Sequence, residues 1–451
     1  MGDDSARPAR RIAVNTLFPF AANLIGRVLA LATAVVLART LGPEGTGAYA
    51  FVINLWLYAS IVSDFGLGTW LTREVARRPD AARELVRLSL GLRLGLSAAS
   101  AAGLVAVAGG YAALGIGGVG REVAATAALL GVGLLPGALS AAGTAVFNAH
   151  ERMVTPAVVQ LLSGGLTAAL GAAVLLGGWG IVALGWVSLG VNCLTAVAFL
   201  VLTGRRFVPL GFEVKPVRQA ALARESLPLM LNGLLNNVFF RFDIQVLQSQ
   251  GSVVVGNYAN AYKVIDAAGV IPSSFVLALF PQLSRRAGSE AGLLTTYALA
   301  AKLLLGTALA LAVLLTLMAE PLTRLAWGVE FLPHSARALQ ILVWFLPLSF
   351  FNGLTQYVLI ALGRQGAITR AFAVAAAFNV AANLLLVPVW GYVAAAGVTV
   401  ATEVVLLVPF LRALRGEIGV RELANAVVRV RPEERAMLAA LGGSVLRRGA
   451  R

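Results

Sequence analysis

Residues 16–41 read TLFPFAANLIGRVLALATAVVLARTL, and this stretch decides the class of the protein. The run is longer than the roughly 20 apolar residues that cross a bilayer as a helix. One ionisable residue, Arg27, lies at its centre, well before Arg39 at its end. The run is also too long for the apolar core of a cleaved signal peptide, about 7–15 residues. We therefore predict a transmembrane helix that remains in the protein.

The rest of the chain has the same character. Of its 451 residues, 59% are hydrophobic and 13% are charged. Soluble domains have about 45–50% apolar and about 25% charged residues, so a water-soluble globule is excluded. Cys193 is the single cysteine, and with two histidines in the whole chain a structural zinc site is not expected. We predict no cofactor and no soluble catalytic domain.

Windows of about 20 apolar residues predict twelve helices, and therefore an all-α polytopic membrane protein. The predicted helices lie at residues 12–39, 48–71, 88–113, 123–147, 154–177, 181–203, 226–248, 256–281, 292–319, 338–362, 367–388 and 392–413. Pro19, Pro136, Pro272 and Pro347 fall within these spans. We expect kinks there, because proline lacks the backbone N–H that a helix needs.

Basic residues are distributed unevenly between these helices. With the N-terminus in the cytoplasm, the inward segments hold 27 of the 36 Lys and Arg residues, and the outward segments hold four. The positive-inside rule then predicts a multi-pass protein of the cytoplasmic membrane with both termini cytoplasmic. The same rule explains most of the net charge of +15 without nucleic acid as a partner.

The chain contains an internal repeat. GAYA at 47–50 opens the second predicted span and GNYA at 256–259 opens the eighth, while WGIVA at 179–183 and WGYVA at 390–394 open the sixth and twelfth. Six helices separate the members of each pair, so the two halves have the same orientation, as in parallel transporter repeats. We predict two six-helix bundles around a central cavity. The predicted segments are a cytoplasmic tail (1–11), the two bundles (12–203 and 226–413), a basic linker (204–225) and a basic tail (414–451).

Several segments resemble the Wzx-type polysaccharide flippases of the multidrug/oligosaccharidyl-lipid/polysaccharide (MOP) exporter superfamily. They are LGPEGTGAY at 41–49, DFGLG at 64–68 with REVAR at 73–77, and LGRQ at 362–365. The resemblance covers about residues 12–413. It implies a bacterial or archaeal transporter, not an enzyme, that moves polyprenyl-pyrophosphate-linked oligosaccharide across the cytoplasmic membrane for cell-surface polysaccharide synthesis. Lipid-linked oligosaccharide and membrane lipids would be its ligands, and a glycan polymerase or glycosyltransferases its partners.

Charges inside the spans mark candidate substrate contacts, since such residues usually line a polar path or pair with each other. Arg27 and Arg241 are candidates for the pyrophosphate, because a guanidinium can hold two phosphate oxygens. The alternative for each is a structural ion pair. Lys302 either snorkels outward or faces the cavity, and Asp64 is a further candidate for substrate binding. Arg93 is expected to anchor its helix at the inner interface.

Coupling to H⁺ or Na⁺ is a second expectation. Four residues match, by resemblance, the sodium site of some lipid II flippases, and they are Asp243, Asn379, Asn383 and Thr399. Asn383 is neutral where those proteins carry an acid, which counts against sodium. Glu403 either takes up a proton or bonds across helices.

Three alternative functions remain open from the sequence. A drug/cation antiporter or a lipid II flippase would share the superfamily fold, although the 41–49 loop and the Asp64 segment favour polysaccharide flippases. A membrane glycan ligase or polymerase would need catalytic residues in a large outer loop, and the longest outward segment spans only about 320–337. The sequence has no Gly-x-x-x-x-Gly-Lys loop for ATP.

Overall fold

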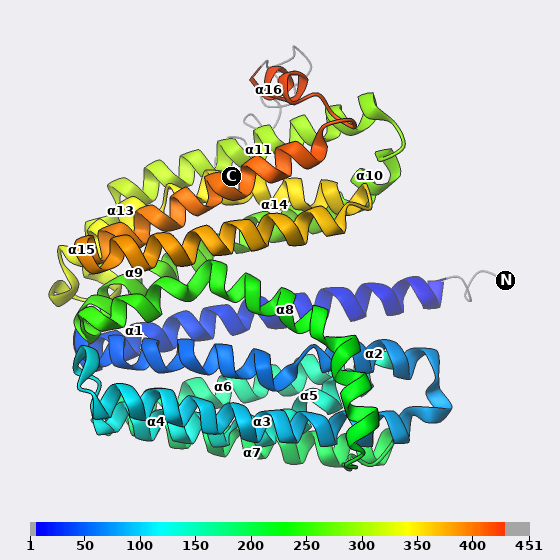
Figure 1. The fold of residues 1–451 in the computed structure, drawn as a ribbon, viewed down its shortest axis with the longest axis vertical. Coiled ribbons are helices and arrows are strands. Elements are labelled where there is room, and N and C mark those ends of the chain that lie inside the picture. Colours follow the sequence, from blue (N-terminus) through cyan, green and yellow to red (C-terminus); the bar gives the residue numbers. More distant parts are fainter. Residues whose placement is uncertain (1–5, 429–451) are drawn as a thin grey trace, which may run out of the picture. The chain divides into compact units, whose positions relative to one another are not determined.

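The computed structural model describes residues 6–428, whose regular structure is entirely helical (Figure 1). The first seven helices are α1 (Ala6–Asp64), α2 (Leu67–Arg77), α3 (Ala82–Ala113), α4 (Arg121–Val132), α5 (Leu134–Ala149), α6 (Val154–Leu176) and α7 (Gly180–Arg206). The others are α8 (Pro216–Leu247), α9 (Ser252–Ala268), α10 (Val270–Arg286), α11 (Glu290–Leu317), α12 (Ala319–Ala326), α13 (His334–Leu342), α14 (Phe345–Ala361), α15 (Gln365–Leu414) and α16 (Val420–Val428). Four 3₁₀ turns lie at Pro79–Ala81, Ile116–Gly118, Gln248–Gln250 and Val329–Phe331.

Within the described residues, eight helical segments are long and apolar enough to cross a membrane. Two of them, in α1 and α15, each contain two of the predicted spans. Each is broken at a glycine, Gly42 (φ 63°) in α1 and Gly391 (φ 59°) in α15. Positive φ with extended ψ is essentially restricted to glycine, so these two residues let the chain reverse without a loop. The predicted helices at 226–248 and 256–281 correspond to α8 and to α9 with α10.

Three of the four prolines at which kinks were expected lie beside helix breaks. Pro136, Pro272 and Pro347 each lie two residues after the start of a helix, α5, α10 or α14, that follows directly on another. The missing N–H and the ring of proline explain why the preceding turn does not continue. Pro19 does not interrupt α1, whose one residue with non-helical backbone angles is Gly42.

The backbone repeats with the same offset as the sequence. Glycines with positive φ recur in pairs that are 209, 210 or 211 residues apart: Gly42 with Gly251, Gly118 with Gly328, and Gly180 with Gly391. Pro136 and Pro347 are 211 residues apart, as are Gly180 and Gly391. The turns between helices therefore repeat, which is what an internal duplication requires.

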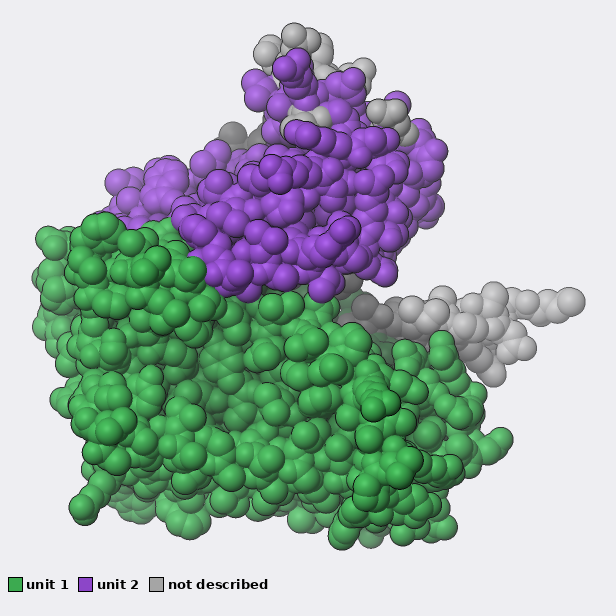
Figure 2. Space-filling model, viewed as in Figure 1, with its two compact units in different colours: residues 1–264, 318–339, 379–398 green, residues 265–317, 340–378, 399–451 purple. Residues whose placement is uncertain are grey.

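The chain forms two compact units (Figure 2). Unit 1 comprises residues 1–264, 318–339 and 379–398, and unit 2 comprises residues 265–317, 340–378 and 399–451. The basic tail predicted at 414–451 lies partly outside the described residues. The six-helix bundles predicted at 12–203 and 226–413 stay a prediction.

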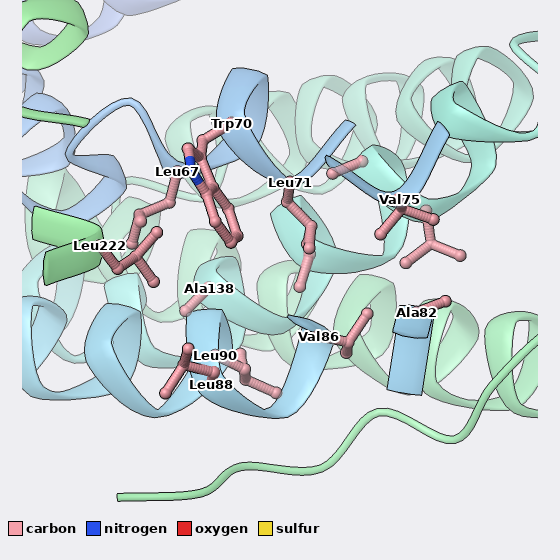
Figure 3. Packing of buried hydrophobic residues seen from close by; sticks show 13 residues of the cluster. Leu67, Trp70, Leu71, Val75, Ala82, Val86, Leu88, Leu90, Ala138 and Leu222 are labelled. Atoms are coloured by element: carbon pink, nitrogen blue, oxygen red, sulfur yellow. The ribbon is translucent and has the colours of Figure 1, made fainter. Parts of the chain in front are cut away.

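Within unit 1, α2 packs on α3 and α5 through an apolar core (Figure 3). Leu67, Leu71 and Val75 are at most 1% exposed, and their spacing of four puts them on one face of α2. Trp70 belongs to the same core, and its indole Nε1 donates to Glu225 Oε2 of α8 at 2.8 Å. This core fixes α2 beside the cavity described below.

The predicted basic linker lies against α3. Glu213 N donates to the carbonyl of Arg87 at 2.9 Å, and Gln219 Nε2 donates to the carbonyl of Glu213 at 2.9 Å. Lys215 Nζ lies 2.8 Å from Glu213 Oε1, and this hydrogen bond holds the pKa of the Glu213 carboxyl below its usual value. The segment is thus an ordered part of unit 1 rather than a loose tether.

Candidate functional site

A polar cavity of about 950 Å³ lies inside unit 1, among α1, α2, α3, α5, α6 and α7. Its polar lining consists mainly of hydroxyl and amide side chains. Several come in pairs three residues apart on one helix, such as Ser60 with Ser63 on α1 and Asn192 with Thr195 on α7. Residues three or four apart share a helix face, so α1, α2, α5, α6 and α7 each turn a polar stripe toward this cavity, whereas α3 contributes Arg93 alone.

Asp64 and Arg93 form an ion pair in the cavity wall. Arg93 Nη2 donates to Asp64 Oδ1 at 2.6 Å, and the Arg93 side chain is 1% exposed while that of Asp64 is 44% exposed. Phe65 (φ 51°) and Gly66 (φ 74°) turn the chain after α1, and Gly66 N donates to Asp64 Oδ2 at 3.1 Å. The prediction of Arg93 as an interfacial anchor is wrong, because its guanidinium is buried inside the unit and paired with Asp64 of α1.

Arg27 lines a second pocket, of about 660 Å³, among α1, α5 and α6. Its side chain is exposed, and Nε donates to Asn23 Oδ1 at 3.2 Å. Thr144, Asn148 and Gln160 line both this pocket and the polar cavity. Two of the predicted substrate residues, Arg27 and Asp64, therefore belong to adjoining hollows of the same unit.

Arg241 and Asp243 on α8 each contact a tyrosine of α9. The Arg241 guanidinium carbon lies 4.8 Å from the centre of the Tyr262 ring, a cation–π contact. Asp243 is buried and accepts hydrogen bonds from Tyr258 Oη and from Ile244 N. Asp243 is thus bonded to α9 of the same unit.

The other predicted residues fall in both units. Asn379 and Asn383 are buried in unit 1, where Asn383 Nδ2 donates to Asn379 Oδ1 at 3.0 Å. Thr399, Lys302 and Glu403 belong to unit 2. Thr399 is buried and Lys302 is half-buried on α11.

Glu403 is a buried carboxylate with a neutral partner. Its side chain is 2% exposed, and Oε2 accepts a hydrogen bond from Asn352 Nδ2 of α14 at 2.6 Å. The bond joins α14 to α15 across helices, which is one of the two roles predicted for Glu403. In the part of the chain that the structure describes, no group of three or more His, Cys, Asp or Glu is placed to hold a metal ion.

The polar cavity was not predicted from the sequence, because the candidate residues were chosen mainly for their charge and the neutral polar residues of the spans were left out. The signal was present in α5, where Ser140, Thr144 and Asn148 recur every four residues in an otherwise apolar helix. A stripe of this kind faces protein or water rather than lipid, because hydroxyl and amide groups are costly in hydrocarbon.

The chain matches the model of a known protein family. A family model described as polysaccharide biosynthesis protein matches residues 12–286, more than half of the sequence. The chain belongs to this polysaccharide biosynthesis family. No curated protein matches the sequence. The matched region includes Arg27, Asp64 and the whole polar cavity.

Solved structures share the fold of this polysaccharide biosynthesis protein. An inward-facing multidrug resistance MATE family transporter of the MOP superfamily has 17% identity and a TM-score of 0.71, over 93% of this chain and 99% of that one. The lipid II flippase MurJ, in an inward closed conformation, has 13% identity and a TM-score of 0.71, over 92% and 90%.

A MOP superfamily transporter from Pyrococcus furiosus has 17% identity and a TM-score of 0.57, over 93% of this chain and 96% of that one. The chain thus has the all-α, polytopic fold of membrane transporters and flippases. The predicted fold class, an all-α polytopic membrane protein, is confirmed.

Proposed function

We propose that this protein moves polyprenyl-pyrophosphate-linked oligosaccharide from the inner to the outer leaflet of the cytoplasmic membrane by alternating access, with both termini cytoplasmic. The observation that carries the proposal is the Arg27 pocket in a member of this family. A guanidinium in the middle of an apolar span is costly unless it meets polar or anionic groups. The two phosphates of the carrier lipid supply oxygens that match its planar fork.

The composition of the Arg27 pocket supports an anionic ligand. Among the described residues that line it, none is Asp or Glu, and Asn23, Asn148 and Gln160 supply neutral amides. Arg27 therefore adds positive charge to a lining that is otherwise apolar or neutral. Such a lining favours pyrophosphate over a cationic drug, which would be expected to need acidic residues.

The remaining predicted contacts have supporting roles in this proposal. Arg241 and Lys302 are further cations for the phosphates or sugars. Coupling would use H⁺ or Na⁺, with Glu403 exchanging a proton or with Asp243, Asn379, Asn383 and Thr399 holding sodium. Imposing a pH gradient and a sodium gradient separately on proteoliposomes would show which ion drives transport. Glycosyltransferases would supply the substrate, and a glycan polymerase would consume the product.

Complementation of a deletion strain tests the proposal. Arg27→Ala should lower surface glycan about tenfold to a hundredfold, the effect of losing one or two charge-assisted hydrogen bonds. Lipid-linked oligosaccharide, measured by mass spectrometry of extracted lipids, should accumulate. Arg27→Lys should be intermediate because it keeps the charge without the fork.

Arg324→Ala is the matched control, because Arg324 is exposed on α12 and lines neither hollow. This variant should restore export fully. If Arg27→Ala also restored export fully while inserting at the normal level, the proposed phosphate contact would be wrong.

A further inference from the structure

We propose that the polar cavity in unit 1 binds the sugars of the substrate while the adjoining Arg27 pocket binds its pyrophosphate. This inference rests on the proposed function and adds a second subsite to it. The subsite is defined by the neutral polar lining of the cavity and by the wall that the two hollows share.

The lining of the cavity matches the chemistry of a sugar. Hydroxyl and amide side chains both donate and accept hydrogen bonds, as the hydroxyl groups of a sugar ring also do. Trp56, which is half-buried, lines the same cavity and offers an apolar face for the C–H side of a ring. A volume of about 950 Å³ lies at the upper end of the roughly 300–1,000 Å³ of ligand pockets.

Charges in the cavity lining are paired with each other or with neighbours. Asp64 is paired with Arg93. Arg73 Nε lies 3.2 Å from Glu74 Oε1, and Arg77 and Arg78 contact the same carboxylate. Apart from Arg73 and the Asp64–Arg93 pair, the described side chains that line the cavity are uncharged, which suits a polyol. Asp64 is 44% exposed, and its carboxylate has acceptor capacity beyond the bonds from Arg93 and Gly66. Vicinal sugar hydroxyls could donate to it.

The wall shared by the two hollows places the two subsites next to each other. Thr144 and Asn148 on α5 and Gln160 on α6 line both hollows. Sugars attached to a pyrophosphate at Arg27 would therefore extend past these three side chains into the cavity. The lining also includes Arg73 and Met153, which lie at helix ends predicted to face the cytoplasm. This placement fits loading of a lipid-linked sugar from the inner leaflet.

Glycines in the linings allow each subsite to be filled separately. A Cβ added at Gly137, which lines the cavity, or at Gly164, which lines the Arg27 pocket, meets no atom within 4 Å. Gly137→Phe and the smaller Gly137→Leu should fill the cavity in two steps, and Gly164→Phe should fill the pocket. Gly103→Phe is the matched control, because Gly103 is exposed on α3, equally open, and lines neither hollow. All four changes remove a helical glycine, which favours folding.

Binding to two lipids by the purified full-length protein tests the assignment. The probes are polyprenyl pyrophosphate without sugar and the lipid-linked oligosaccharide fraction extracted from the deletion strain. Gly137→Phe should weaken binding of the glycosylated lipid about tenfold, the effect of losing one neutral hydrogen bond, and leave binding of bare polyprenyl pyrophosphate unchanged. Gly137→Leu should have a smaller effect of the same kind. Gly164→Phe should weaken both probes, and Gly103→Phe neither.

Two different failures are distinguishable. If Gly137→Phe, with an unchanged melting temperature, bound the glycosylated lipid as tightly as the wild type, the sugar subsite would be refuted and the flippase proposal would stand. If the wild type bound neither lipid, or if the deletion strain accumulated no lipid-linked oligosaccharide, the proposed function itself would fail, and the sugar subsite with it.

Discussion

Unit 1 and unit 2 each contain a carboxylate with a buried partner, a charged one in unit 1 and a neutral one in unit 2. In unit 1, Asp64 faces the buried guanidinium of Arg93 at 2.6 Å. In unit 2, Glu403 is 2% exposed and accepts from the neutral amide of Asn352 at 2.6 Å. Within the described residues, Glu403 has no salt-bridge partner.

This difference indicates different roles for Asp64 and Glu403. A charge that is paired inside a protein is held in one state, because removing either partner leaves the other uncompensated. A carboxyl group with a neutral partner has no such constraint. Asp64 therefore suits a fixed cavity wall, whereas Glu403 suits proton exchange in the coupling that we propose.

Breaking the Asp64–Arg93 pair should have the largest effect on stability. Asp64→Asn should lower the free energy of unfolding by roughly 2–3 kcal/mol, somewhat less than for a fully buried pair because Asp64 is 44% exposed. Thermal unfolding in detergent measures the change. The double variant Asp64→Asn with Arg93→Gln should recover more than half of the loss, since no buried charge is left over. If it recovered nothing, the pair would not be the cause.

Removing a neutral partner of Glu403 should have the next largest effect. Asn352→Leu deletes the donor of the 2.6 Å bond and leaves Ser349 as a hydrogen-bond partner of Glu403. The change should cost about 1–1.5 kcal/mol, the contribution of one hydrogen bond. Adding Glu403→Gln to Asn352→Leu should reduce that cost. The same thermal unfolding measurement applies, and equal costs for the single and double variants would contradict the account.

Neutralising Glu403 alone should leave stability nearly unchanged but abolish transport driven by a pH gradient. Glu403→Gln keeps an oxygen for Asn352 and should change stability by less than about 1 kcal/mol. Transport driven by an imposed pH gradient in proteoliposomes should nevertheless be lost, whereas Asp64→Asn should retain its response to that gradient. A Glu403→Gln protein that still used the pH gradient normally would remove Glu403 from the coupling proposal.

Crowding the unit 1 pair without breaking it should have the smallest effect. A Cβ added at Gly68 lies 3.4 Å from Asp64 Oδ1 and 3.6 Å from Arg93 Nη2, which is ordinary contact. Gly68→Ala should therefore change the free energy of unfolding by less than about 0.5 kcal/mol. A large fall in the free energy of unfolding would show that the pair needs open space beside it. The effect of Asp64→Asn could then not be attributed to the lost charge alone.

The sequence was sufficient for the fold because the determinants of the fold are local. Long apolar runs place the spans, Pro136 and Pro347 place equivalent breaks, and an offset near 210 residues in the motifs reappears in the glycine turns. The chain reversals at Gly42 and Gly391 lie between spans that the sequence predicts separately, but the sequence did not show that one glycine makes each reversal without a loop.

The site was predictable only in part because its contacts are distant in sequence. Arg27 was found from its charge within a span. The partner of Arg93 lies 29 residues away on another helix, so spacing could not reveal it, and Arg93 was assigned to the interface. The cavity draws neutral residues from five helices, and no single segment predicts that they converge.

A flipping assay with purified protein tests the central claim most directly. Proteoliposomes would hold the lipid-linked oligosaccharide in both leaflets, and a membrane-impermeant lectin would report the share of glycan exposed outside. We predict that the wild-type protein and Arg324→Ala both make the inner-leaflet glycan accessible to the lectin. Arg27→Ala should do so more slowly, by about tenfold or more. Glycan that stayed protected with wild-type protein, in vesicles that expel a fluorescent cationic drug, would contradict the flippase account and favour a drug antiporter of the same fold.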